Sequence, residues 1–293
     1  MLNQLSFVAY ADILGFTNLI GVNNNSNEYH QNLDDLTIYL EQIIKQVKEQ
    51  LETTTISLEG EIKIFSDNFL FWVPFQKNLS IDHQIVLSLQ SLSYLQFWMA
   101  CEGFFIRGGI CCDLAYCNNN VAIGPALVKA VELEKNAIFP RLLIDSDTAN
   151  KYLLPYLENE LKGNNRLNKL FLIDDSGNYF LNYLVIIFEY IIISMAVELE
   201  DCKNQNERTE LLCSTIRFHC EKLKKHKKKI EEGLKVNKEE PAIYSKYIWL
   251  RDYHNFFCSY IDGDYVPESE IIIECQNSRQ FSHCYPITYS MFL

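Results

Sequence analysis

The stretch 6–17, SFVAYADILGFT, constrains the fold more than any other part of the chain. Its apolar, aromatic and β-branched run is typical of a buried strand. Asp12 ends that run, and Gly15 allows the backbone to turn tightly. We expect Phe16 and Thr17 to open a helix, whose free backbone N–H groups can receive an anion. The stretch therefore predicts a strand, a carboxylate and an anion-binding loop in succession.

The same stretch has a simpler interpretation, because Asp and Gly after a strand are also ordinary turn residues. The segment 60–74, GEIKIFSDNFLFWVP, favours the functional interpretation. Two strand-like runs flank Ser66, Asp67 and Asn68, which indicates a β-hairpin with Asp67 at its tip. If this hairpin pairs with the first strand, Asp12 and Asp67 meet at one edge of a sheet. Two such carboxylates can hold two hard divalent cations about 4 Å apart.

The remainder of the first half alternates helical and strand patterns. Helices are expected over 33–51 and 80–103, the second capped by Ser80 or Asp82. Next come a strand at 104–110 and a hairpin that turns at 118–120 through residues that tolerate positive φ. A helix from Pro125 and a closing strand at 141–145 follow. This order predicts an α+β fold in which helices cover an antiparallel sheet. Cys111 and Cys112 should point to opposite faces of their strand.

The second half, 148–293, is interpreted as a mixed, mainly helical C-terminal extension packed on the first domain, 1–147. It contains a helical stretch at 146–163, a hairpin turning at 175–177, a basic helix at 220–235 and an aromatic helix at 244–261. The apolar run 184–197 is too short for an ordinary membrane span. We interpret it as a buried helix or strand.

Composition excludes several classes of protein. The chain has 293 residues, 48% of them hydrophobic, which is ample for a buried core, and a formal net charge of −12. That charge argues against binding to nucleic acid or insertion into an acidic membrane. Ten cysteines without a CxxC pair, and no signal peptide, predict reduced thiols in the cytoplasm. A zinc site remains an alternative, although its spacing matches no recurring pattern; its ligands would be His254, Cys258, Cys275, His283 and Cys284.

The motifs DILGFT, KIFSD, FFIRGGICCDLAY and NVAIGPALVKAVELE resemble, in order and spacing, those of class III nucleotidyl cyclase catalytic domains. The segments FSDNFLF, RGGI, GPALVKAVELE and AIFPRLLID are most similar to those of the bacterial pyrimidine nucleotide cyclases of the Pycsar antiphage system. The resemblance is strong in the first half and weaker in the second. It implies the class III cyclase fold over 1–147 and conversion of UTP or CTP to 3′,5′-cyclic UMP or CMP plus pyrophosphate. The product would signal to a separate cyclic-nucleotide-binding effector.

The resemblance also implies roles for individual residues. Asp12, Asp67 and the backbone carbonyl of Ile13 would hold two Mg²⁺ or Mn²⁺ ions, one of which activates the ribose 3′-hydroxyl for attack on the α-phosphorus. Arg107 would contact the terminal phosphates, unless it only forms a strand-edge ion pair. The triphosphate would be gripped by the loop containing Gly15, Phe16 and Thr17. Because cyclase sites of this kind form between two catalytic domains, a homodimer is implied.

Two departures from the family pattern bear on the substrate and the catalyst. Lys63 stands at one base-reading position, as in many adenylate cyclases, but Val121 stands where those enzymes carry aspartate. Val121 cannot accept a hydrogen bond from a purine amine, so a pyrimidine is favoured. Lys63 has an alternative interpretation as a solvated strand-edge residue. The expected transition-state asparagine and arginine are replaced by Val128 and Glu132.

A catalyst without those donors needs another cation to stabilise the transition state. We expect Arg141 to substitute for them, with Lys129 as a second candidate. Two alternatives to a pyrimidine cyclase stay open. One is an adenylate or guanylate cyclase of the same fold, and the other is a non-catalytic nucleotide-binding scaffold. The pairing of Asp12 with Asp67 argues against a scaffold, which has no need of metal carboxylates.

Overall fold

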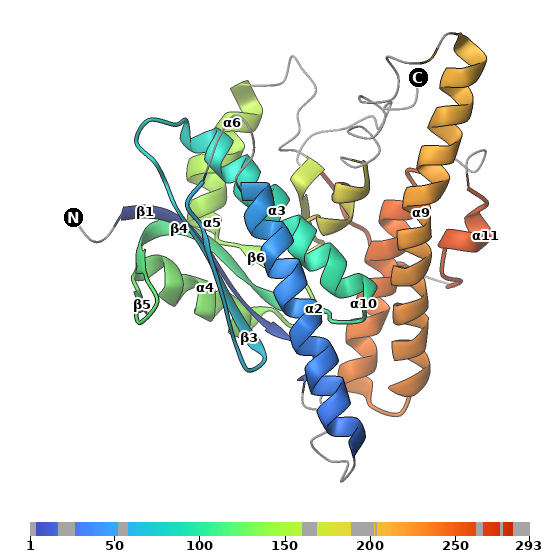
Figure 1. Cartoon of the computed structure of the whole chain (residues 1–293), viewed down its shortest axis with the longest axis horizontal. Coiled ribbons are helices and arrows are strands. Elements are labelled where there is room, and N and C mark those ends of the chain that lie inside the picture. Colours follow the sequence, from blue (N-terminus) through green and yellow to red (C-terminus); the bar gives the residue numbers. More distant parts are fainter. Residues whose placement is uncertain are drawn as a thin grey trace.

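A mixed β-sheet with helices on both faces organises the chain (Figure 1). The computed structural model describes residues 4–16, 27–51, 58–159, 169–188, 202, 204–261, 266–275 and 278–283. The strands are β1 (Gln4–Ile13), β2 (Glu61–Phe65), β3 (Asn68–Pro74), β4 (Ile106–Cys117), β5 (Ala122–Ile123), β6 (Leu142–Ile144), β7 (Phe171–Ile173) and β8 (Tyr179–Leu181). The helices are α2 (Asn27–Leu51), α3 (Ile81–Cys101), α4 (Pro125–Asn136), α5 (Ser146–Thr148), the π-helix η1 (Ala149–Leu153), α6 (Leu154–Asn159), the 3₁₀-helix η2 (Tyr183–Val185), α9 (Gln205–Val236), α10 (Pro241–Cys258) and α11 (Glu268–Ile271).

The strand order is β2-β3-β1-β4-β6-β8-β7, with β5 paired to β4. The predicted α+β class is confirmed. The sheet is mixed rather than antiparallel, because β6 runs parallel to β4. A parallel neighbour needs a crossover connection, and α4 supplies it. The expectation that 141–145 closes the sheet is wrong, since β8 pairs with β6 and β7 extends the sheet further.

The sheet continues across the predicted domain boundary. Strand β6 belongs to the first half of the chain, and its Leu143 pairs with Phe180 of β8 in the second half. One cluster of buried side chains likewise includes Phe7 of β1 and Trp249 of α10. The division into 1–147 and 148–293 stays a prediction. The hairpin of the second half contributes strands to the central sheet.

The two faces of β1 carry different cores. Phe7 and Ala9 pack in the cluster that contains residues of α2 and α3, whereas Val8 packs in the cluster that contains Ala126 and Ala130 of α4. Cys111 lies in the α4 cluster and Cys112 in the opposite one, so their predicted orientation is confirmed. The residues Tyr10 and Asp12 follow Val8 at two-residue spacing and therefore share the α4 face.

Glycine lets α4 approach this face closely. A Cβ atom at Gly109 would overlap Leu133 and the backbone oxygen of Ala130, and one at Gly108 would overlap β1 at Tyr10. The RGGI motif therefore brings α4 and β1 closer to β4 than larger residues would allow. This close approach determines where the inner side chains of α4 reach the sheet.

A chain of buried hydrogen bonds holds the C-terminal helices together. His254 Nε2 lies 2.7 Å from the carbonyl oxygen of Ile271, which can only accept, so this nitrogen donates. His254 Nδ1 must then accept from His226 Nδ1 at 2.9 Å, and Tyr183 donates its hydroxyl to His226 Nε2 at 2.8 Å. These hydrogen bonds link η2, α9, α10 and α11. Helices α9 and α10 stand together beside the sheet (Figure 1).

Other expectations concern cysteines, metals and membranes. Each cysteine within the described residues is a free thiol. In the same part of the chain no three His, Cys, Asp or Glu side chains are grouped so that they could hold a metal ion, which gives no support to the zinc alternative; Cys284 lies outside the described residues. None of the described helices is long and apolar enough to cross a membrane. Much of the apolar run 184–197, from residue 189 on, also lies outside the described residues.

Candidate active site at the end of β1

Asp12 and Asp67 come together at the end of β1. Asp12 pairs with Asn68 of β3 on one side and with Arg107 of β4 on the other. Asp67 lies in the turn between β2 and β3, where Ser66 has φ of 59°, and its carbonyl oxygen accepts the Ile13 N–H at 2.7 Å. The predicted hairpin with Asp67 at its tip, and its pairing with the first strand, are confirmed.

The Asn68 amide links the Tyr10 phenol to the Asp67 carboxylate. The Tyr10 hydroxyl donates to Asn68 Oδ1 at 2.7 Å, and Asn68 Nδ2 donates to Asp67 Oδ1 at 2.8 Å. Burial raises the pKa of Tyr10, and so do the nearby negative charges of Glu134, Asp67 and Asp12. The three carboxylates therefore lie near enough to the Tyr10 phenol for their charges to act on it.

Arg107 makes a bidentate interaction with the carboxylate of Asp12. Its Nε lies 2.9 Å from Asp12 Oδ1 and its Nη2 lies 2.9 Å from Asp12 Oδ2. The same Nη2 makes an ion pair with Glu134 Oε1 at 3.0 Å, and Nη1 donates to the Ala137 carbonyl oxygen at 3.3 Å. The hydrogen bonds to Asp12 raise the pKa of Arg107 against the effect of burial. The strand-edge ion pair, one of the two interpretations of Arg107, is present in this structure.

Two charged residues of the site were not found from the sequence. Glu134 is 8% exposed; burial raises the pKa of its carboxyl, and so does Asp12, while Arg107 lowers it. Its signal was its four-residue spacing after Ala126 and Ala130, which puts it on the stripe of α4 that faces the sheet. Lys246 of α10 is half-buried. Burial lowers the pKa of its ammonium, the charge of Arg107 lowers it further, and the charge of Asp12 raises it. No motif indicated that α10 would reach this site.

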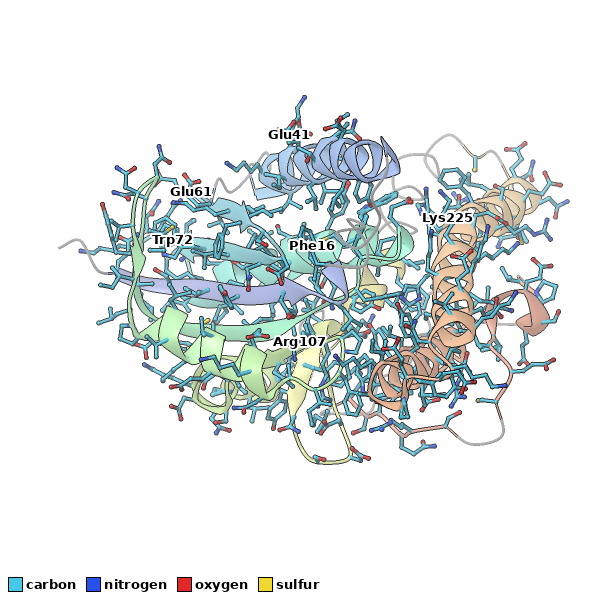
Figure 2. All side chains as sticks on the ribbon, turned by 90° about the horizontal axis from the view of Figure 1, so that it is seen from below. Phe16, Glu41, Glu61, Trp72, Arg107 and Lys225 are labelled. Carbon is cyan, nitrogen blue, oxygen red and sulfur yellow. The ribbon has the colours of Figure 1, made fainter. Side chains whose placement is uncertain are left out.

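The loop after β1 begins beside these side chains. Gly15 has φ of 70°, which favours glycine, and the Leu14 N–H donates to the Phe105 carbonyl oxygen at 2.7 Å. The Ile13 and Leu14 amides already bond within the fold, so neither is free to bind an anion. Anion binding by the loop at Gly15, Phe16 and Thr17 stays a prediction. Phe16 and Arg107 lie toward the same end of the sheet (Figure 2). Thr17 and the predicted helix after it lie outside the described residues.

The two predicted base-reading residues lie near one hairpin. Lys63 shares the face of Asp12 by strand register. Burial raises the pKa of Cys117, and the nearby Lys63 ammonium offsets part of that rise. Cys117 ends β4, and Val121 follows in the β4–β5 hairpin with 48% of its surface exposed. Asn118 Oδ1 accepts the Val121 N–H at 2.8 Å, so a side chain closes this turn. The predicted turn at 118–120 forms without a positive φ, since Ser66 alone among described non-glycine residues has one.

Arg141 points away from solvent and already has a partner. Its Nη1 lies 2.6 Å from Asp174 Oδ2, and the two side chains are 7% and 6% exposed. Its guanidinium carbon lies 5.4–5.6 Å from the ring centroids of Phe139, Phe180 and Trp249. This environment is that of a buried structural ion pair. A catalytic role for Arg141 stays a prediction.

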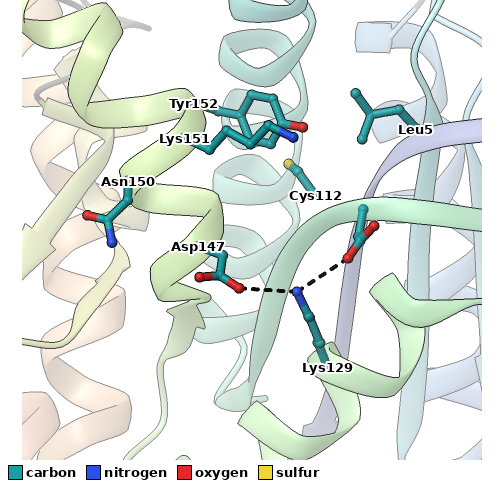
Figure 3. Close-up of a pocket in the computed structure, with 8 residues that line it drawn as sticks. Leu5, Cys112, Lys129, Asp147, Asn150, Lys151 and Tyr152 are labelled. Carbon is teal, nitrogen blue, oxygen red and sulfur yellow. Dashed lines mark hydrogen bonds and ion pairs between the residues drawn. The ribbon is translucent and has the colours of Figure 1, made fainter.

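Lys129, the other candidate cation, faces a separate cavity of about 460 Å³ (Figure 3). Its Nζ lies 3.3 Å from Asp113 Oδ2 and 3.4 Å from Asp147 Oδ2. Val128 is 58% exposed, and Glu132 is also exposed. None of these three side chains makes a hydrogen bond or ion pair with Asp12 or Arg107 in the structure. The cavity is lined by Leu5, Cys112, Asp113, Lys129, Asp147, Asn150, Lys151 and Tyr152.

Comparisons with known proteins give little beyond this geometry. No protein-family model matches the chain, and no curated protein matches it either. The crystal structure of the adenylyl cyclase CyaB from P. aeruginosa is similar, with 15% sequence identity and a TM-score of 0.40 over 61% of this chain and 94% of that chain. A TM-score of 0.40 is too low to carry a conclusion about activity. The chemistry of the site is therefore inferred from its own residues.

Proposed function

We propose that the chain is a metal-dependent nucleotidyl cyclase that converts UTP or CTP to the 3′,5′-cyclic monophosphate and pyrophosphate. The observation that carries the proposal is the pairing of Asp12 and Asp67 at the end of β1. Asp12 lies in β1 and Asp67 in the β2–β3 turn, which is distant in sequence, and the hydrogen bond from the Ile13 N–H to the Asp67 carbonyl holds the two segments together. A purely structural strand end has no need of two convergent carboxylates.

The donor set fits Mg²⁺ or Mn²⁺. The carboxylates of Asp12 and Asp67 and the carbonyl of Ile13 are the hard oxygen ligands that these ions prefer. Asp12 already binds a positive group, the Arg107 guanidinium, which marks the carboxylate as a cation site. Divalent ions bound there would lower the pKa of the ribose 3′-hydroxyl and neutralise the pyrophosphate.

The chain's own residues would orient the nucleotide. Arg107 presents a planar guanidinium, which suits phosphate oxygens, and the loop after Leu14 would supply backbone N–H groups. Lys63 and Val121 would contact the base. An apolar side chain at Val121 offers no acceptor for the amine of adenine, and this favours the smaller pyrimidines.

A homodimer is part of the proposal. Four large apolar side chains on β4, the β4–β5 hairpin and the outer face of α4 are exposed by 46–59%, and a second copy of the chain is the partner that we propose for them: Leu114, Val121, Ile123 and Val128. Lys63 and Val121 of one protomer would then face the metal carboxylates of its partner. Val128 and Glu132 face outward and would also lie near that shared site. Because neither side chain is positively charged, another residue would have to supply the transition-state cation.

The test is incubation of the purified protein with Mn²⁺ and each of the four ribonucleoside triphosphates, with products identified by mass. We expect a cyclic pyrimidine monophosphate from the wild type, none from Asp67→Asn, and an unchanged yield from Asp147→Asn, which alters an exposed carboxylate. A cyclic purine would identify a purine cyclase.

A scaffold is the second candidate function, and one observation favours it. The exposed Val128 and Glu132 stand at the positions that should carry transition-state donors. The alkyl side chain of Val128 and the ionised carboxylate of Glu132 cannot donate a hydrogen bond. If none of the four triphosphates yields a cyclic product while the protein still binds nucleotide, the scaffold is the better conclusion.

A further inference from the structure

The guanidinium of Arg107 is divided between two carboxylates. An arginine has five N–H donors, and the nitrogens of Arg107 contact four oxygens on three residues. The edge formed by Nε and Nη2 binds both oxygens of Asp12. Nη2 also pairs with Glu134, and Nη1 donates to the Ala137 carbonyl oxygen. The group is therefore held from two sides, one of them a metal carboxylate and the other the end of α4.

The edge that holds Asp12 is also the edge that suits phosphate. The Nε and Nη2 donors point in parallel and match two oxygens of a carboxylate or a phosphate. While Arg107 forks onto Asp12, both carboxylate oxygens accept its hydrogen bonds, and a divalent cation must compete for them. Release from Asp12 frees the Nε–Nη2 edge without breaking the contacts to Glu134 and Ala137.

We infer that Arg107 caps Asp12 until a divalent cation displaces it, and that Glu134 then holds the guanidinium so that its freed edge binds the triphosphate. This inference rests on the proposed function and deepens it. Glu134 is a positioning residue that acts through Arg107, and the device makes metal binding a condition of the phosphate contact.

The surroundings of Glu134 suit this task. The Glu134 side chain is 11% exposed on the inner face of α4, and the close approach at Gly109 brings this face onto β4. Lys246 lies close enough for its pKa to respond to Arg107, and its positive charge disfavours movement of the guanidinium toward α10. Released from Asp12, Arg107 therefore keeps Glu134 as a partner, and the positive charge of Lys246 repels it.

The test measures two affinities of the full-length protein by calorimetry: that for Mn²⁺ alone, and that for inorganic pyrophosphate at saturating Mn²⁺. Arg107→Met should tighten Mn²⁺ binding roughly tenfold, because the competitor for Asp12 is gone. Glu134→Gln should weaken pyrophosphate binding roughly tenfold, because Arg107 is no longer held. In the Arg107→Met background, Glu134→Gln should not weaken it.

Simple charge effects give the opposite sign, which makes the result decisive. Removal of a negative charge near a bound anion should tighten its binding, so a Glu134→Gln protein that binds pyrophosphate as well as or better than the wild type overturns the inference. Equal weakening in both backgrounds overturns it as well. Glu231→Gln, which removes one negative charge from an exposed side chain on α9, is the charge-matched control and should leave both affinities unchanged.

Failure of the proposed function has its own signature. If Asp12→Asn leaves Mn²⁺ binding unaltered, the metal site itself is refuted and the inference with it. If Mn²⁺ binding depends on Asp12 but Arg107→Met does not tighten it, only the inference is refuted. Arg107→Lys keeps the positive charge but loses the two parallel N–H donors, so this variant should bind pyrophosphate more weakly than the wild type. Thermal melting checks that each variant is folded.

Discussion

Replacing Asp174 with Asn tests whether Arg141 is structural or catalytic. The substitution keeps the shape of the side chain and one carbonyl oxygen for the backbone N–H groups of Ser176 and Asn178, which lie 2.9 and 2.8 Å from Asp174 Oδ1. It removes the charge that partners Arg141 at 2.6 Å. The perturbation is therefore the loss of one buried ion-pair partner.

The magnitude follows from burial. Both side chains are less than a tenth exposed, and removal of one partner of a buried pair leaves an uncompensated charge at a cost of roughly 3–5 kcal/mol. The three aromatic rings around the guanidinium offset part of this cost, so we expect a loss of about 3 kcal/mol, or a fall in Tm of roughly 6–12 °C. Burial raises the pKa of the Asp174 carboxyl, but hydrogen bonds from Asn178 and Arg141 outweigh it, so the pKa lies below its ordinary value and the pair is ionised at neutral pH.

The assay is thermal and urea unfolding followed by circular dichroism. Asp174→Asn combined with Arg141→Met should recover much of the lost stability, because an apolar replacement of both partners removes the stranded charge. An unchanged Tm for Asp174→Asn, together with loss of product formation, would refute this reasoning. Arg141 would then be a catalytic group, as the sequence suggested.

Three further predictions concern the helix contact, acid stability and base choice. Gly109→Ala should lower the free energy of unfolding by roughly 1–3 kcal/mol in urea titrations, because the methyl group displaces α4. Stability should fall as the pH drops from 6.5 to about 4, because burial lowers the pKa of His254 to about 4 and lowers that of His226 as well, so that the unfolded state binds protons first. The dependence of Tm on pH should be weaker in His254→Gln, and an equally steep slope in that variant would contradict the assignment. Val121→Asp should raise the yield of cyclic AMP relative to cyclic pyrimidines in the four-nucleotide assay, because a carboxylate can accept from adenine.

Local patterns were enough to predict most elements of the fold. The run before Asp12, the two halves of the Asp67 hairpin and the helix that begins at Pro125 each carry their own periodicity and boundary residues, and all appear in the structure. The parallel partner of β4 was missed because pairing is decided by how a crossover returns to the sheet. No local signal distinguishes a strand that closes a sheet from one that gains another neighbour.

The same distinction separates the site residues that were found from those that were missed. Asp12 and Asp67 mark the ends of recognisable strands, and turn chemistry brings them to one place. Glu134 and Lys246 reach the site only because of how α4 and α10 lie against the sheet. Arg141 was chosen for its proximity in sequence, but its partner Asp174 comes from the β7–β8 turn, which no local pattern connected to it.

The charges around Asp12 explain why such a site would take up metal and triphosphate together. The carboxylates of Asp12, Asp67 and Glu134 are partly balanced by Arg107 and Lys246 before any ligand binds. Two divalent cations alone would add four positive charges to this space, whereas two cations with a nucleoside triphosphate add almost none. The second metal ion should therefore bind well only with the nucleotide. Arg107 enforces the same order from the protein side, because it can leave Asp12 for phosphate only after a cation has taken its place.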